Sequence, residues 1–300
     1  MTLIRSFFFC LCLAAGAALA QDEAQLRPDL ERAYARWRSA VLAKDARAWA
    51  AAITMHRQII TRNLVISQGV PFPKAVFETM LSPADVTGLR LLEVQAVGDT
   101  AHLLYFGQVD LGDAPDVIPE NLLLLKFFRE KAGSWKFDSS KFIQLSTQPE
   151  RRAKLLAGEA PDFLDLPEFT PPGTPPATPP LCAVPDHITG CTLQTIGYET
   201  TLLVNGQEHY AADTVARLFL TGGLKNGTNT LQLRAKKLDL PKDAKDAERV
   251  LEIDFFTKPT QPGARPQRVF HYEYKGRGTP KEGQWTLDMP LSQELIILQE

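Results

Sequence analysis

The sequence contains little cysteine and no surplus of charge of either sign. Four of its 300 residues are cysteine, and 33 Lys and Arg stand against 35 Asp and Glu, for a formal net charge of −2. Nucleic-acid-binding proteins normally carry a clear basic excess, so we expect no nucleic-acid partner. The histidines of the second half, His187, His209 and His271, are widely spaced. The sequence therefore predicts no metal site and no other cofactor.

Long apolar runs are absent after the first 20 residues. Residues 1–20 combine a basic start at Arg5, an apolar stretch over Leu11–Leu19 and the small-residue motif Ala18-Leu19-Ala20. This pattern is typical of a signal peptide that is cleaved after Ala20, with an uncleaved anchor as the alternative. The apolar stretch is too short to span a membrane comfortably. We expect an exported protein, periplasmic or secreted, with no transmembrane segment.

Cysteine is scarcer still in the mature chain. Cys10 and Cys12 are lost with the signal peptide, which leaves only Cys182 and Cys191 in an oxidising compartment. Their spacing predicts a disulfide that closes a small loop, with two free thiols as the alternative.

Proline, in contrast, is concentrated in one place. Six prolines occur in the ten residues from Pro171 to Pro180. Proline fixes φ and lacks an amide donor, so such a stretch favours an extended linker over a packed core. We therefore predict a first domain over residues 21–166, a proline-rich linker over 167–181 and a second domain over 182–300.

The first domain changes its hydrophobic period from helical to alternating at about residue 89. The expected helices cover 28–42, 48–53, 56–67 and 74–81, and the expected strands cover 89–97, 101–111, 121–130 and 135–145. Helices followed by an antiparallel meander predict an α+β domain with its helices on one face of the sheet.

Three short stretches of the first domain resemble the nuclear transport factor 2-like superfamily, which includes SnoaL-type cyclases and ketosteroid isomerase. They are Trp37-Arg38-Ser39-Ala40, the stretch from Lys44 to Trp49, and Gly133-Ser134-Trp135-Lys136-Phe137. The resemblance implies a cone, in which a curved antiparallel sheet wraps around helices and encloses a pocket. It also implies a homodimer through the sheet face, which the apolar run Leu122–Leu125 would suit. Members include enzymes and binding modules, so the resemblance does not choose between them.

Family enzymes usually place an Asp/His or Asp/Tyr constellation inside the cone. The candidates for such a role here are Tyr105, Asp110 and His56. No paired carboxylates appear at a catalytic spacing, so structural roles for all three are favoured and we lean against an enzyme.

Polar residues that would line the predicted pocket are Arg62, Asn63 and Lys126. We expect Lys126 to share a sheet face with Tyr105. Arg62 and Asn63 would lie at the mouth of the cone. Alternatively, they belong to the end of a helix that Gly69 caps in the left-handed conformation.

The second domain consists of short alternating runs separated by turn signals such as Asn205-Gly206 and Asn226-Gly227. The expected strands cover 198–204, 215–220, 230–238, 249–257, 268–275 and 285–289, with 295–298 as a further candidate. The stretch Gly222–Leu231 is similar to an element of immunoglobulin-like and galactose-binding-like sandwiches. We predict an all-β sandwich that follows the α+β cone.

The aromatic residues Tyr272, Tyr274 and Trp285 are candidates for a sugar-stacking platform, with cross-strand packing as the alternative. The sequence as a whole favours an exported, non-catalytic two-domain protein. Its cone would bind a small molecule or a protein partner, and its sandwich would serve interaction or attachment. The alternatives are a small-molecule isomerase, dehydratase or cyclase that uses the cone pocket, and a glycan-binding module in the sandwich.

Overall fold

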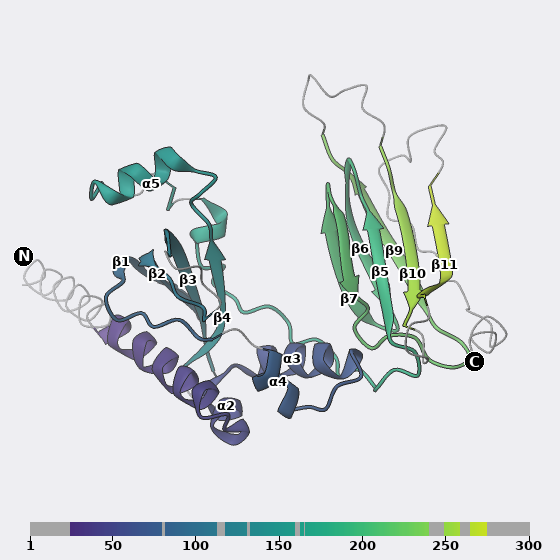
Figure 1. Ribbon diagram of the computed structural model, residues 1–300, viewed down its shortest axis with the longest axis horizontal. Coiled ribbons are helices and arrows are strands. Elements are labelled where there is room, and N and C mark those ends of the chain that lie inside the picture. Colours follow the sequence, from purple (N-terminus) through teal and green to yellow (C-terminus); the bar gives the residue numbers. More distant parts are fainter. Residues whose placement is uncertain are drawn as a thin grey trace, which may run out of the picture. The chain divides into compact units, whose positions relative to one another are not determined.

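The computed structural model describes residues 25–79, 82–112, 118–130, 133–159, 163–164, 166–239, 249–258 and 265–274 (Figure 1). These residues form two compact units. The first contains the described residues up to Gln58 together with Phe77–Thr178, and the second contains Ile59–Val76 and the described residues from Pro179 onward. No helix in the described part of the chain is long and apolar enough to cross a membrane.

The first unit is built on a four-stranded antiparallel meander. Its strands are β1 (Arg90–Val97), β2 (Thr100–Gln108), β3 (Glu120–Arg129) and β4 (Trp135–Ile143), in the order β1-β2-β3-β4. All four were predicted within three residues at each end, because their apolar runs and the Gly98 turn are clear in the sequence.

Helical segments cover both faces of this sheet. On one face lies the first helix, residues 25–42, whose Tyr34 and Trp37 rings pack 5.3 and 4.2 Å from the ring of Phe137 in β4. The other face buries leucines of β2 and β3 against α5 (Pro149–Leu156) and the 3-10 helix η1 (Pro167–Phe169). Leu155 of α5 and Phe169 of η1 are almost fully buried there.

The predicted cone is therefore wrong. The described chain is mostly β, in three antiparallel sheets, and the first sheet lies between helical elements instead of wrapping around them. Every predicted helix of this domain precedes the sheet, whereas α5 and η1, which were not predicted, follow it. Leu122–Leu125 are at most 2% exposed, so this run packs inside the chain and offers no open apolar face for the predicted dimer.

The unit boundaries also differ from the predicted domains. Three helices connect the first helix to the sheet: α2 (Ala46–Ala52), α3 (Met55–Ser67) and α4 (Lys74–Thr79). The segment Ile59–Val76, which includes most of α3, is grouped with the second unit, although the prediction assigned it to the first domain. Gly69, with a φ of 70°, ends α3 in the left-handed conformation, as one of the two alternatives predicted.

Both ends of the proline-rich segment are held by hydrogen bonds. In the first unit, the Gly173 carbonyl accepts from the Asp99 amide at 2.8 Å, and the Gly173 amide donates to Thr100 Oγ1 at 2.9 Å. In the second unit, the Pro180 carbonyl accepts from Asn63 Nδ2 at 2.9 Å. The segment has no helix or strand between these points, but it is anchored at each end.

The second unit contains two antiparallel sheets that share one core. One sheet has the order β11-β10-β5-β8 and the other the order β7-β6-β9. The strands are β5 (Thr189–Gln194), β6 (Tyr198–Val204), β7 (Gln207–Ala212), β8 (Val215–Phe219), β9 (Leu231–Lys237), β10 (Glu252–Thr257) and β11 (Gln267–Glu273) (Figure 1). Inward-facing residues such as Leu193, Leu202, Leu233 and Phe255 fill the space between the sheets, which is the arrangement of a two-layer sandwich.

Candidate functional site

Two of the predicted catalytic residues, Tyr105 and Asp110, each bind a different residue of the first unit. Tyr105 donates its hydroxyl hydrogen to Glu31 Oε1 at 3.1 Å and is 2% exposed. Burial and then the Glu31 carboxylate raise the pKa of Tyr105 well above its usual value, so it stays protonated at neutral pH. Asp110 accepts a hydrogen bond at 2.7 Å from the Gly112 amide in the loop after β2. Each of the two residues is thus held by a partner within the first unit.

His56, the third candidate, lies in a buried cluster around Asp138 of β4. Its Nδ1 lies 3.3 Å from Asp138 Oδ1, which also accepts from Thr54 Oγ1 at 2.6 Å. Arg57 Nη2 reaches the other carboxylate oxygen at 3.2 Å. Burial alone would raise the pKa of Asp138, but hydrogen bonds from His56 and Thr54 and the charge of Arg57 lower it to about 2. The cluster therefore fixes the start of α3 against β4, which is a structural role.

Arg62 and Asn63 bind backbone groups and do not line the mouth of a pocket. Asn63 is 1% exposed, and its side chain donates to the Pro180 carbonyl at 2.9 Å and accepts from the Cys182 amide at 3.2 Å. Arg62 Nη1 donates to the Cys182 carbonyl at 3.1 Å. Asn63 and Arg62 Nη1 thus bind the backbone of the segment around Pro180 and Cys182 within the second unit.

Lys126 lies on the sheet face opposite to Tyr105. The β2–β3 register pairs Lys126 with His102 and Tyr105 with Leu123, and successive residues of a strand point to opposite faces. The predicted shared face of Tyr105 and Lys126 is therefore wrong. His102 itself has its Nε2 2.8 Å from Glu93 Oε2.

The predicted disulfide is absent from the structure, in which Cys182 and Cys191 are free, buried thiols. Cys191 points from β5 into the sandwich core, whereas Cys182 lies beside Ser67, with 3.9 Å between Sγ and Oγ. Burial raises the pKa of Cys191 to about 12, so its thiol is inert at neutral pH.

The predicted sugar platform is not formed by its two described members. Tyr272 and Tyr274 are partly buried and pack against the sandwich core. Trp285, the third member, lies outside the described residues, as do the strands expected at 285–289 and 295–298. The packing alternative therefore holds for the two tyrosines.

A groove of about 750 Å³ in the first unit is lined mostly by alanines of the first helix and α2, with Trp135 at one end. The charged groups among the described residues that line it are Arg36, Asp45 and Lys136. Asp45 caps α2 by accepting from the Arg47 and Ala48 amides, and Lys136 pairs with Glu130. This groove therefore indicates no particular chemistry.

The β11-β10-β5-β8 sheet of the second unit has a polar face that points away from the core, which we call the outer face. Gly190, which has no side chain, lies on this face together with Thr192 and Gln194 of β5, Val215, Arg217 and Phe219 of β8, Glu252, Asp254 and Phe256 of β10, and Arg268, His271 and Glu273 of β11. Two features lie next to each other on it: a cluster of ionisable groups and an apolar trough.

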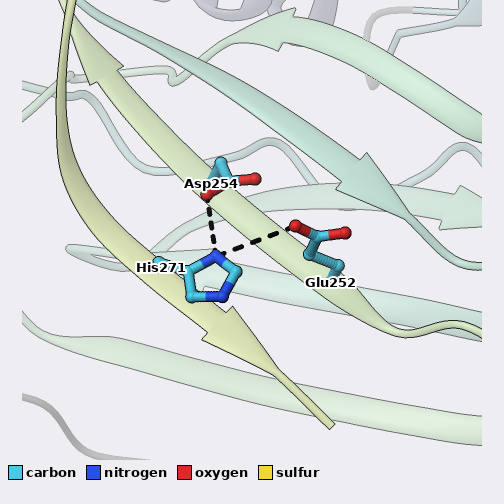
Figure 2. Close-up of side chains that lie close together, drawn as sticks. All are labelled: Glu252, Asp254 and His271. Carbon is cyan, nitrogen blue, oxygen red and sulfur yellow. Dashed lines mark hydrogen bonds and ion pairs between the residues drawn. The ribbon is translucent and has the colours of Figure 1, made fainter.

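The ionisable cluster joins two neighbouring strands (Figure 2). His271 is the cross-strand partner of Asp254, and its Nδ1 lies 2.9 Å from Asp254 Oδ1 and 3.8 Å from Glu252 Oε1. Glu252 is two residues from Asp254 on the same strand, so both carboxylates point to one face. The ligand atoms of these three residues all lie within 4.8 Å of one another, which makes them candidates to hold a metal ion.

The trough lies over Gly190. The register places Gly190 between Phe256 of β10 and Phe219 of β8, so a position without a side chain is flanked by two aromatic rings. Phe219 is 47% exposed. The hollow has a volume of about 580 Å³, and Arg217, Arg265 and Pro266 complete its rim.

Neither the ionisable cluster nor the trough was predicted from the sequence, because both depend on strand pairing. A Glu252-x-Asp254 spacing on a strand does indicate two carboxylates on one face. What it does not give is the strand pairing that brings His271 to them, or the one that places Gly190 between Phe256 and Phe219. Those pairings join residues that are far apart in the chain.

No protein-family model, no curated protein and no solved structure matches this chain. The resemblances drawn from the sequence therefore have no relative to support them, and the function has to be argued from the geometry of the outer face.

Proposed function

We propose that this is an exported, non-catalytic binding protein and that its ligand lies in the trough over Gly190. The observation that carries the proposal is a gap between two phenylalanines, Phe219 and Phe256, on a sheet face that is otherwise covered by side chains. Small-molecule sites are typically concave, largely apolar and about 300–1,000 Å³ in volume, with a few polar groups at the edge. The trough fits each of these terms.

Gly190 has no evident structural reason to be glycine. Its φ is not positive, and a Cβ added there would meet Phe256 O at 3.8 Å and Leu218 O at 3.9 Å, which are ordinary van der Waals contacts. Glycine weakens the interior of a strand, and where it persists it often marks close approach of a ligand or another backbone. The missing side chain therefore supports a site in which something lies flat against the sheet.

The rim of the trough favours an anion. Arg217 and Arg265 are exposed at its edge, and the described residues that line it include no acidic side chain. Two phenylalanines offer stacking surfaces to a flat ring, and arginine pairs well with carboxylate or sulfonate groups. The ligand class is a planar, negatively charged small molecule.

A binding role is also favoured over catalysis by the state of the titratable groups in the first unit. An enzyme of the isomerase or dehydratase type needs an acid and a base with pKa values near neutrality. Asp138 has a pKa of about 2, and the pKa of Tyr105 is far above its usual value. Each is held by protein partners, so neither is poised for proton transfer.

A fluorescence titration with two probes tests the proposal on the chain from Gln21 to Glu300. The anionic probe is 8-anilinonaphthalene-1-sulfonate, and the neutral probe of similar shape is N-phenyl-1-naphthylamine. Gly190→Leu fills the trough and is expected to weaken the binding of both probes by about tenfold or more. Arg217→Gln is expected to weaken the binding of the anionic probe alone, by about two- to fivefold, because an exposed ion pair contributes little to the free energy of binding.

The matched control is Val215→Leu, which enlarges an exposed side chain on β8 outside the trough. Thermal melts of all variants check that the fold is retained. Unchanged binding of both probes by Gly190→Leu would rule the trough out as the ligand site.

A further inference from the structure

We propose that Glu252, Asp254 and His271 form a zinc site, independent of the trough and of its ligand. His271 Nδ1 faces Asp254 Oδ1 at 2.9 Å and Glu252 Oε1 at 3.8 Å (Figure 2). A zinc ion with bonds of about 2.1 Å holds tetrahedral ligand atoms about 3.4 Å apart. These two separations lie on either side of this value, and the ligand atoms of the two carboxylates lie within 4.8 Å of each other, so shifts of about 1 Å or less complete three coordination positions.

The backbone positions these ligands without flexible loops. Asp254 and His271 are direct cross-strand partners in the β10–β11 ladder, and Glu252 follows the period of two on β10. A register shift between Phe255 and Phe256 lies directly beside the cluster. Such bulges are often found next to functional sites, where they redirect a side chain.

The surrounding side chains orient the ligands. Gln194 Nε2 donates to Glu252 Oε2 at 2.6 Å, which leaves Glu252 Oε1 facing His271. His271 Nε2 lies 4.0 Å from Glu273 Oε2, on the side of the ring away from the proposed ion. A carboxylate beside the distal nitrogen of a metal-bound histidine is a recurrent arrangement, because it fixes the orientation of the ring.

One contact opposes the metal. Arg268 Nη1 lies 3.3 Å from Asp254 Oδ1, the same oxygen that faces His271. The Arg268 side chain is 56% exposed, whereas that of Asp254 is 10% exposed. Arg268 therefore competes with the ion for Asp254 but is free to swing into solvent. One imidazole and two carboxylates suit zinc better than Mg²⁺ or Ca²⁺, which prefer oxygen ligands only, and water would take the fourth position.

The test is calorimetric titration of the chelator-treated chain from Gln21 to Glu300 with ZnCl₂ and, separately, with MgCl₂. We expect one zinc ion per chain and no magnesium binding. His271→Gln and Asp254→Asn remove ligands. Loss of a residue that only orients a ligand typically lowers metal affinity by about 10- to 100-fold, and loss of a ligand lowers the affinity at least as much.

Gln194→Leu removes the hydrogen bond that orients Glu252 and is expected to weaken zinc binding about tenfold. Arg268→Gln is expected to tighten zinc binding, because it removes the competitor. His187→Gln is the matched control, since His187 binds Asn226 and is not part of the cluster. His271 is exposed enough for its variant to fold if Asp254→Asn does not. Absence of zinc binding by the wild type, wild-type affinity in His271→Gln, or weaker binding in Arg268→Gln would each overturn the assignment.

Discussion

The hydroxyl of Thr54 donates a hydrogen bond of 2.6 Å to the buried carboxylate of Asp138, 84 residues further along the chain. The same hydroxyl accepts from the Arg57 amide at 3.1 Å, so Thr54 caps the first turn of α3 while it binds β4. Thr54 therefore fixes the start of α3 relative to β4. The strength of its hydrogen bond to Asp138 depends on the negative charge of that carboxylate.

We expect Asp138→Asn to lower the free energy of unfolding by about 2 kcal/mol at pH 7, because the ionised carboxylate is stabilised in the fold. Its pKa falls from an ordinary value of 3.8 to about 2. This stability is therefore present above pH 3.8 and is lost as the pH falls through about 2. Urea unfolding measured from pH 7 to pH 2 checks both the size and the window.

The matched control for that variant is Glu159→Gln, which removes one exposed acidic charge from the same unit. Its unfolding free energy should follow that of the wild type at every pH. The proposed role of Asp138 fails if the wild type and Asp138→Asn stay equally far apart at pH 7 and pH 2.

A second pH effect is expected from His209 of β7, which is 8% exposed and whose Nε2 has no hydrogen-bond partner among the described residues. Burial lowers its pKa from 6.5 to about 4. The unfolded chain takes up this proton below pH 6.5 and the folded chain only below about 4. Stability is thus full above pH 6.5 and falls by about 3 kcal/mol as the pH drops to about 4.

His209→Leu should abolish that loss, and it should be at least as stable as the wild type at pH 7, because it removes an unsatisfied buried nitrogen. His187→Gln, near the surface, should leave the pH profile unchanged. Thermal melts of the three proteins between pH 7 and pH 4 give the comparison. A wild-type profile in His209→Leu would contradict the assignment to His209.

Much of the strand structure follows from the sequence because its signals are local. The predicted strand over residues 198–204 coincides with β6, whose alternation is clear and is followed by the Asn205-Gly206 turn. β5 and β7 were missed because their inward positions carry Thr189, Cys191, Gln207 and His209 in place of large apolar residues. Burial of these side chains depends on the partner sheet, which no local pattern reveals.

The cone prediction was wrong because it left one face of the sheet uncovered, although the strands themselves were assigned correctly. Leu122–Leu125 form a continuous apolar run, which indicates a strand buried on both faces. One face is covered by the first helix, but the other needs elements such as Leu155 of α5 and Phe169 of η1, which follow the sheet. The predicted dimer instead left that face open for a second copy. At the candidate site, the carboxylate spacing was local, but the pairing of Asp254 with His271 was not.

Asn63 provides a test of how the segment before the sandwich is held. Its amide binds Pro180 and Cys182, and it also donates to Gln207 Oε1 at 3.3 Å. Asn63→Ala leaves buried polar groups without partners, which costs about 1–3 kcal/mol for each group. We expect a lower melting temperature and faster proteolytic cleavage near Pro180. Gln68→Ala, a half-buried position directly after the same helix whose side chain binds the Leu64 carbonyl, is the control, and equal cleavage rates in the two variants would refute the anchoring role.

The two cysteines allow the last prediction, which separates free thiols from the disulfide that the sequence predicted. Cys191 is 3% exposed with a pKa of about 12, and Cys182 is 9% exposed. Neither should therefore react with a maleimide in the folded chain from Gln21 to Glu300 at pH 7. Denaturant without reductant should expose both, and mass spectrometry should then show two added maleimides. No addition until a reductant is present would mean that Cys182 and Cys191 are bonded, and that β5 and the Cys182 segment pack differently from the structure described.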